Sequence, residues 1–193
     1  MRVLIVFAHP LKDSFHGTLY REIARALEQA GHAVDSCDLY AEGFVPVLTA
    51  EDRERYFDPA QNRQGVEAYI ERLFAAEALV LCFPVWCFGP PAILKGFMDR
   101  VMIPGVSFVL GPDGRMHPNL RQIRKLVAVT SYGRPRLDAW WIGDPPRRLV
   151  TRYLRWFIAP RAEVRYFGLY DLHRDESRLQ AFRSKVLAAM RSF

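Results

Sequence analysis

The chain predicts an α/β protein in which a doubly wound parallel sheet of five strands carries helices on both faces. Two observations support this fold class. Short apolar runs alternate with segments whose apolar residues recur at helical spacing. The first run, residues 2–8, is almost continuously apolar, as expected of a parallel strand covered on both sides. Because no repeat, low-complexity segment or linker interrupts the alternation, a single domain over residues 1–193 is expected.

The elements of the first half follow from the spacing of apolar residues and from the residues that typically begin and end helices. After the strand at 2–8, a helix is expected over 14–30, with Ser14 suited to cap its first turn and Gly31 suited to end it. Residues 33–39 read as the second strand. The segment 41–63 is long and irregular, and loops of this length in compact domains are often functional.

The second half continues the alternation. Its predicted elements are a helix at 64–76, a strand at 78–83, a helix at 91–102 opened by two prolines, a hairpin around 111–114, a strand at 125–130, a helix at 146–158, a strand at 162–169 and a helix at 175–193. Five strands and five helices in this order fit the flavodoxin-like strand order 2-1-3-4-5. The loops after strands one, three and four then meet at one edge of the sheet.

Composition excludes several classes of protein. The chain is 50% hydrophobic and 25% charged, which is ordinary for a globular protein, and no apolar run is long enough to span a bilayer. No signal peptide pattern is seen at the N-terminus. The cysteines at 37, 82 and 87 show no metal spacing, so no metal site is expected, and a reducing cytoplasm fits them best.

The net charge of +6 is unevenly distributed. Residues 121–165 hold eleven lysines or arginines and only three acids. An anionic dinucleotide or a merely solvated basic face explains this segment better than nucleic acid, because no RNA-binding or zinc-finger pattern accompanies it. Since guanidinium groups match phosphate geometry, the arginines favour NADPH over NADH.

The loop after the first strand leads into a helix N-terminus, which suits phosphate because its amides are free and its dipole is positive. His9 and Ser14 add polar donors there. The alternative is a simple capped turn with an exposed histidine. The absence of a glycine-rich fingerprint argues against a dinucleotide-binding motif of the Rossmann kind.

Two further loops have features of a ring-binding site. Residues 84–88 place Trp86 and Phe88 between prolines that restrict the backbone, and this suits a flat, partly apolar wall. Residues 130–133, expected just after the fourth strand, are small enough for main-chain amides to approach a ligand. Such amides would stabilise negative charge developing on a reduced flavin. The alternative for the aromatic loop is packing beneath a neighbouring element.

Together these segments resemble the NAD(P)H:quinone oxidoreductase family, the DT-diaphorase-like flavoenzymes, and especially its short bacterial members. The segments that carry the resemblance are Ala8-His9-Pro10 with Ser14-Phe15, Phe83-Pro84 with Trp86, Pro91 to Gly96 with Asp99-Arg100-Val101, and Thr130 to Gly133. The resemblance implies a homodimer, FAD (or FMN in some relatives) as cofactor, and two-electron ping-pong reduction of quinones by NADH or NADPH.

The resemblance also assigns residues. The cofactor-binding set that it implies is His9, Ser14, Phe15, His16, Gln61, Asn62, Pro84, Val85, Trp86, Cys87, Phe88, Thr130, Ser131, Tyr132 and Gly133. Gln61 and Asn62 would reach the adenine half of FAD from the long loop. Tyr132 and Gly133 are expected to contribute to catalysis, chiefly through main-chain amides.

The chain departs from the family in ways that keep a second function open. Cys87 replaces an aromatic residue of many relatives, and the Tyr and His pair of the animal enzymes has no counterpart after the fourth-strand loop. The alternative is a flavodoxin-fold partner subunit, for example of a potassium-efflux transporter, that binds flavin with little turnover. The expected helix at 91–102 is apolar over a wide arc, which suggests a subunit interface, with Lys95 and Asp99 as structural pairing residues.

Overall fold

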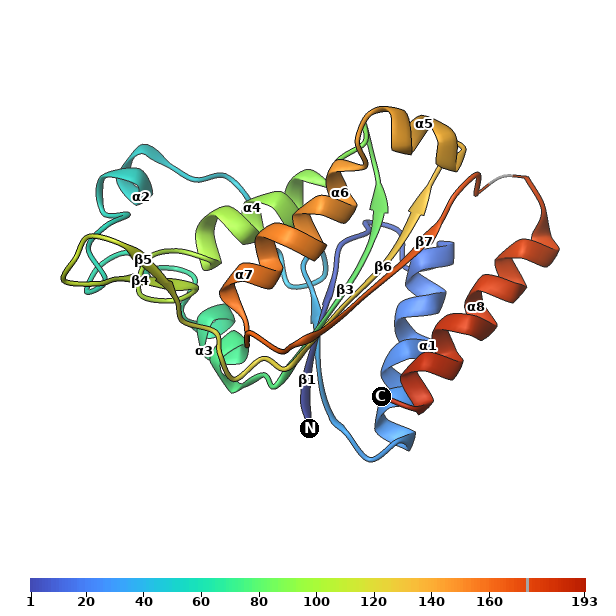
Figure 1. The fold of residues 1–193 in the computed structure, drawn as a ribbon, viewed down its shortest axis with the longest axis horizontal. Coiled ribbons are helices and arrows are strands. Elements are labelled where there is room, and N and C mark those ends of the chain that lie inside the picture. Colours follow the sequence, from blue (N-terminus) through green and yellow to red (C-terminus); the bar gives the residue numbers. More distant parts are fainter. Residues whose placement is uncertain (173) are drawn as a thin grey trace.

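The parallel sheet organises the molecule. The computed structural model describes residues 1–172 and 174–193. Five parallel strands lie in the order β2-β1-β3-β6-β7, which confirms the predicted flavodoxin-like order 2-1-3-4-5 (Figure 1). They are β1 (Arg2–Phe7), β2 (Ala33–Asp38), β3 (Ala78–Val85), β6 (Lys125–Tyr132) and β7 (Glu163–Leu169). The predicted hairpin is a separate antiparallel pair, β4 (Phe108–Leu110) and β5 (Met116–Pro118).

Helices cover both faces of the sheet (Figure 1). One face carries α1 (Phe15–Gln29) and α8 (Glu176–Arg191). The other carries α3 (Glu67–Ala75), α4 (Ala92–Val101) and a run formed by α6 (Pro145–Arg148), the π-helical segment η1 (Leu149–Leu154) and α7 (Arg155–Phe157). The short helix α5 (Arg136–Trp141) lies beyond the carboxyl ends of β3 and β6, and α2 (Ala50–Glu54) lies within the long 41–63 segment. Within the described residues, no helix has the length and apolar character needed to cross a membrane.

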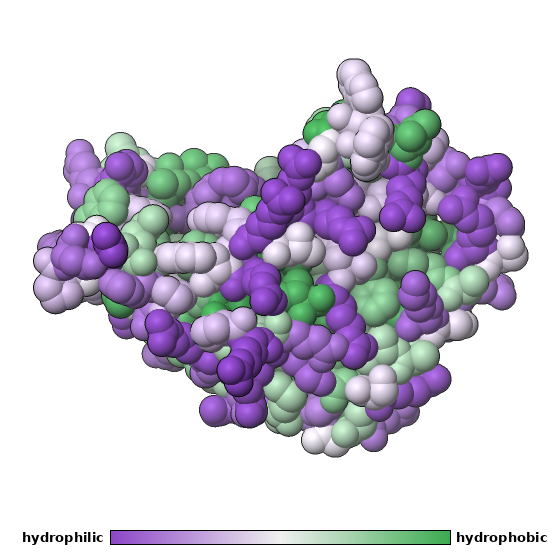
Figure 2. Space-filling view, in the orientation of Figure 1, coloured by the Kyte–Doolittle hydropathy of each residue, from purple (hydrophilic) through white to green (hydrophobic). Residues whose placement is uncertain are grey.

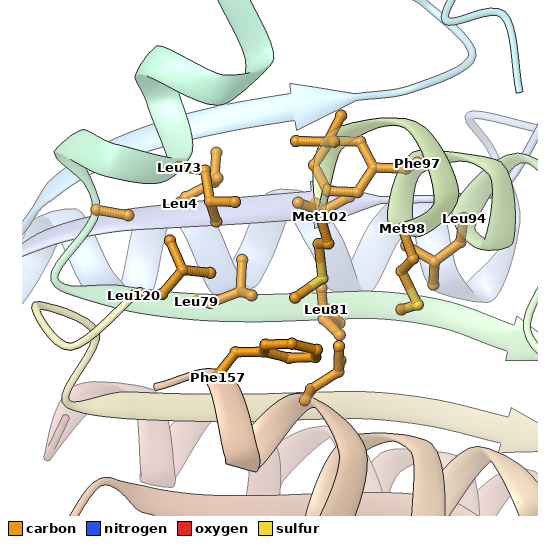
Figure 3. Packing of buried hydrophobic residues seen from close by; sticks show 14 of the residues in the cluster. Leu4, Leu73, Leu79, Leu81, Leu94, Phe97, Met98, Met102, Leu120 and Phe157 are labelled. Carbon is orange, nitrogen blue, oxygen red and sulfur yellow. The ribbon is translucent and has the colours of Figure 1, made fainter. Parts of the chain in front are cut away.

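A separate cluster of buried apolar side chains packs on each face of the sheet. On the α4 side, Phe157 packs beside Leu81 of β3 and Met102 (Figure 3). On the α1 side, Ile5 and Val186 belong to the second cluster and are fully buried. Because both faces are buried, the central strands are nearly continuous apolar runs.

The wide apolar arc of α4 is covered within the chain. The Phe97 ring lies 5.7 Å from that of Phe44, and a Cβ at Gly96 would lie 2.2 Å from the Pro46 carbonyl oxygen. Residues following β2 thus cover the second apolar face, so this arc gives no support for a subunit interface. The predicted pairing of Lys95 with Asp99 is confirmed by an Nζ to Oδ1 distance of 2.5 Å.

Several boundaries differ from the prediction. Strands β3 and β6 continue through Val85 and Tyr132 because Pro84 pairs with Ser131 and Val85 with Tyr132. Residues 130–132 therefore belong to the strand, and the loop begins at Gly133. Helices α2 and α5 are additional to the five predicted, because five or six residues are too short for periodicity to reveal. The single helix expected at 146–158 is instead the α6–η1–α7 run, with its π-helical centre.

Candidate functional site

The three predicted loops meet at the carboxyl edge of the sheet. The rings of His9, after β1, and Trp86, after β3, lie 5.8 Å apart. His16, in the first turn of α1, reaches across to β6, where its Nε2 lies 2.7 Å from Ser131 Oγ. Direct contacts thus join the first loop to both of the others, as expected for the topological edge of an open α/β sheet.

The loop after β3 is a tight turn in a strained conformation. Trp86 and Gly89 exchange two main-chain hydrogen bonds, of 3.0 and 2.8 Å, around Cys87 and Phe88. Both central residues have positive φ, 49° and 55°, which defines a type I′ turn that normally takes asparagine and glycine. Left-handed backbone costs about 1–2 kcal/mol for a residue with a side chain. Strain of this kind concentrates at functional sites.

This turn forms one wall of a cavity of about 490 Å³, a volume in the range of small-molecule sites. Its lining residues are Val85, Trp86, Cys87, Phe88, Tyr132, Gly133 and Arg134. No acceptor bonds the amides of Cys87 and Phe88, or those of Gly133 and Arg134, anywhere in the described chain. The cavity therefore combines aromatic surface with free main-chain donors on two opposing loops.

A second apolar cavity of about 480 Å³ adjoins the first, because Phe88 and Arg134 line both. Its remaining lining comes from α5 and the residue after it, namely Leu137, Asp138, Trp140, Trp141 and Ile142. Trp140 and Trp141 are 72% and 81% exposed, which is unusual for tryptophan. No helix was predicted at these residues, although the proline at 135, directly before α5, is typical of a helix start.

Beneath the Gly133 loop lies a cluster of three tyrosines and one aspartate. Tyr132 donates its hydroxyl to Asp144 Oδ1 at 2.5 Å and lies 2.5 Å from the Tyr166 hydroxyl, while Tyr170 donates to Asp144 Oδ2 at 3.0 Å. Burial, chiefly, raises the pKa of Tyr132 far above its usual value, so this hydroxyl stays neutral. Tyr132 borders the cavity but is only 1% exposed, and its hydroxyl bonds inside this cluster.

The start of α1 presents the groups expected of an anion site. Ser14 caps the helix by accepting from the Gly17 amide at 3.1 Å. The amides of Phe15 and His16 have no acceptor among the residues that the structure describes. His9 Nδ1 accepts from the Leu11 amide at 3.0 Å, which leaves the ring proton on Nε2, and partial burial lowers the pKa of His9. The neutral ring is thus a donor beside the free amides.

Three predicted cofactor residues lie under the site rather than in its wall. His16 is 2% exposed, and burial, assisted by the nearby His9, lowers its pKa to about 3. Ser131 is its partner, and the fully buried Thr130 bonds the Tyr166 hydroxyl at 3.1 Å. These side chains support the loops and hold them together.

Gln61 and Asn62 are not brought to the three loops. Asn62 donates to the carbonyls of Tyr56 and Pro104, both at 2.9 Å, and Gln61 donates to Asp58. Asn62 therefore fastens the 41–63 segment to the chain after α4, on the side of the molecule that carries α2 and the β4–β5 hairpin, whereas Gln61 bonds only within that segment (Figure 1).

Fold and sequence comparison together define the class of protein. A profile described as flavodoxin-like fold matches residues 1–189, and the chain belongs to this family. Among individual relatives, the chain is 32% identical over 148 residues to NAD(P)H dehydrogenase [quinone] 1 of Rattus norvegicus, covering 68% of this chain and 54% of that protein. The predicted resemblance to NAD(P)H:quinone oxidoreductases is thereby confirmed. The chain spans about half the length of the curated relatives it matches.

Solved structures agree with this assignment. The NAD(P)H:quinone oxidoreductase from Methanothermobacter marburgensis has a TM-score of 0.82 and 25% identity, with 99% of this chain and 98% of that chain covered. The FMN-dependent NADH-azoreductase from Bacillus anthracis, solved in complex with FMN, has a TM-score of 0.77 and 16% identity, with 98% and 97% covered. The second likeness concerns the fold alone.

Proposed function

We propose that this protein is a flavin-dependent NAD(P)H oxidoreductase that reduces quinones or similar acceptors in two-electron, ping-pong turnover. The observation that carries the proposal is the cavity between the Trp86–Gly89 turn and Gly133, with its aromatic wall and free amides on both sides. The named activities of the quinone oxidoreductase relatives support the same conclusion.

Two features of the cavity suit an isoalloxazine ring. Trp86 and Phe88 supply flat apolar surface, and the amides of Cys87, Phe88 and Gly133 can donate to the acceptor atoms N1, O2, O4 and N5 of the ring. When bound, the flavin would accept a hydride from NAD(P)H and pass two electrons to a quinone, which takes up two protons to give the hydroquinone.

The tail of the flavin would bind at the start of α1. There the amides of Phe15 and His16 meet the positive end of the helix dipole, and His9 donates through Nε2. Ser14 holds this turn in place through its cap. In this proposal His16 and Ser131 act by fixing the position of the turn against β6.

The protein's own contribution to catalysis is electrostatic. Main-chain amides of Gly133 and Arg134 would stabilise negative charge on the reduced cofactor, as donors do in an oxyanion hole. Because the Tyr132 hydroxyl bonds Asp144 and its main-chain oxygen accepts from the Leu172 amide, Tyr132 serves in this proposal only to position Gly133. Arg134 is paired with Asp138 at 2.7 Å, so its charge is partly neutralised. No side chain is assigned as a general acid or base.

Between the two flavins, the contacts favour FMN. The ring and first phosphate have candidate partners, whereas the residues expected to bind the adenine half, Gln61 and Asn62, bond to the chain itself. The azoreductase of the same fold was solved with FMN. FAD, the cofactor implied by the resemblance, stays the alternative, and mass spectrometry of the cofactor released from purified protein decides between them.

A homodimer is part of the proposal. Exposed aromatic side chains of Phe57, Tyr153 and Trp156 supply apolar surface beyond the covered arc of α4. Light scattering on purified protein is expected to give twice the chain mass of 22.3 kDa, and a monomer at micromolar concentration contradicts the expectation.

The decisive experiment measures flavin content and turnover together. Purified protein should carry flavin absorbance and oxidise NADH or NADPH with menadione as acceptor. Trp86→Ala should weaken flavin binding, whereas Trp156→Ala, an equally exposed tryptophan outside the cavity, should not. Protein that binds neither FMN nor FAD overturns the proposal. Intact flavin binding with negligible turnover would instead favour the regulatory partner subunit.

A further inference from the structure

A third cavity, of about 340 Å³, lies beside the two apolar cavities, but its lining is mainly polar. Four arginines line it, from α5, α6 and η1: Arg136, Arg147, Arg148 and Arg152. We call it the arginine cavity. Figure 2 shows hydrophilic side chains gathered over α6, below the protruding α5. All four arginines are exposed, and this concentration of positive charge favours an anion in the cavity.

The arginines are not neutralised by the protein. In the described part of the chain, none of the four has a carboxylate within 4.0 Å. The single acid of the lining, Asp144, accepts hydrogen bonds from Tyr132 and Tyr170 on its two oxygens. Its charge is therefore engaged from within the protein, and the cavity keeps a large positive excess.

Local structure holds these guanidinium groups in place. Arg147 lies over the Tyr166 ring, 5.7 Å from its centroid. The guanidinium of Arg148 occupies the space beside Gly143, where a Cβ would lie 3.1 Å from Nη1. Gly143 has φ of +89°, a conformation that glycine adopts without strain. The arrangement is therefore built into the chain at the turn between α5 and α6.

The arginine cavity is connected to the proposed flavin site through shared lining residues. Trp140 lines both it and the neighbouring apolar cavity, and Phe88 and Arg134 line both that cavity and the flavin site. The three neighbouring cavities thus lead from an aromatic ring site, past the exposed indole of Trp140, to the four arginines. NADPH carries the same kinds of group: a redox ring at one end and, at the other, an adenine that stacks on aromatic surface and whose ribose bears a phosphate dianion.

From this arrangement we infer that the arginine cavity binds the 2′-phosphate of NADPH, with Trp140 beside the adenine, and so makes NADPH the preferred electron donor. The inference rests on the proposed function, since it places the nicotinamide at the flavin site. The pyrophosphate cannot supply the preference, because NADH carries the same group. Arg148 and Arg152 are specificity-determining residues in this assignment.

The kinetic test compares the two nucleotides in matched variants. Wild-type protein is expected to have a kcat/KM for NADPH at least about tenfold above that for NADH, equivalent to about 1.4 kcal/mol. The double variant Arg148→Gln/Arg152→Gln should lose this preference through a higher KM for NADPH and keep the NADH value within about twofold. Arg161→Gln removes an exposed arginine of the same basic segment outside the cavity and should leave both nucleotides unchanged.

A binding measurement gives a readout independent of turnover. In calorimetry on wild-type protein, 2′,5′-ADP should bind at least about tenfold more tightly than 5′-AMP, which lacks only the 2′-phosphate. Inorganic phosphate at the same concentration should not displace it. Equal affinity for 2′,5′-ADP and 5′-AMP, or displacement by phosphate alone, overturns the inference, as does loss of flavin from the double variant.

The two proposals fail in different ways. Oxidation of NADH by wild-type protein tests the flavoenzyme without any 2′-phosphate. Brisk NADH turnover with no NADPH preference overturns the arginine cavity assignment and leaves the proposed function standing. Tight 2′,5′-ADP binding by protein that holds no flavin supports the cavity and overturns the function.

Discussion

The burial of His16 makes the free energy of unfolding depend on pH in a defined window. Burial lowers the pKa of His16 from 6.5 to about 3, so the ring stays neutral in the folded protein. In the unfolded chain the imidazole returns to a pKa of about 6.5. Between these values the unfolded state binds one more proton than the folded state, so the free energy of unfolding falls as the pH is lowered from 6.5 towards 3.

The magnitude follows from linkage. For one group with these two pKa values, stability falls by about 2.5 kcal/mol between pH 6 and pH 4. His16→Asn removes the titrating ring, and its stability should lack this component. The assay is urea unfolding followed by circular dichroism at half-unit steps from pH 7 to pH 4, with the variant curve subtracted from the wild-type curve.

The control is Ser184→Ala, which changes an exposed side chain and removes no ionisable group. Its difference curve should be flat across the same range. A flat curve for His16→Asn as well, or an NMR titration of His16 with a midpoint near 6.5, would refute the reasoning, because the ring would then be open to water in the folded protein.

Three further variants test other contacts of the site and its supports. Ser131→Ala leaves the buried imidazole without its partner and should cost about 1–3 kcal/mol in urea unfolding, whereas the exposed Ser184→Ala should stay within about 0.5 kcal/mol of wild type. Gly96→Ala places a Cβ 2.2 Å from the Pro46 carbonyl oxygen and should cost about 1–3 kcal/mol by overpacking; an unchanged melting temperature contradicts the described packing. Asp144→Asn weakens a charge-assisted acceptor shared by two tyrosine hydroxyls and should lower stability by about 1–3 kcal/mol; wild-type stability in this variant shows that the cluster does not hold the loop.

The sheet was predictable because its determinants are local. The apolar run at 78–83 and its counterparts identify the strands directly, and their alternation with helices fits the strand order that is observed. Strand ends were less predictable. β6 extends to Tyr132 because β3 continues opposite it. Pairing between strands far apart in the chain cannot be recognised from the local sequence of either strand.

The convergence of three loops was predictable, but the roles of their side chains were not. His16 and Ser131 are 115 residues apart, so nothing near either one indicates that they bond and become buried together. The turn at Cys87 and Phe88 has left-handed backbone at both residues, a conformation that usually requires asparagine or glycine, so the sequence did not predict it. The basic segment was visible in the sequence, yet its division between an arginine cavity and other surface depends on the turn at Gly143.

Helix α5 has a consequence for the range of molecules that the site can accept. Only Ala139 among its six residues is buried, so the helix has little packing to fix it. The rigid sheet defines where a ring lies, while this small, weakly packed wall sets how much room remains beside it. Under the proposed function, a change in acceptor size therefore requires substitutions at only a few exposed positions of α5 and leaves the core of the domain unchanged.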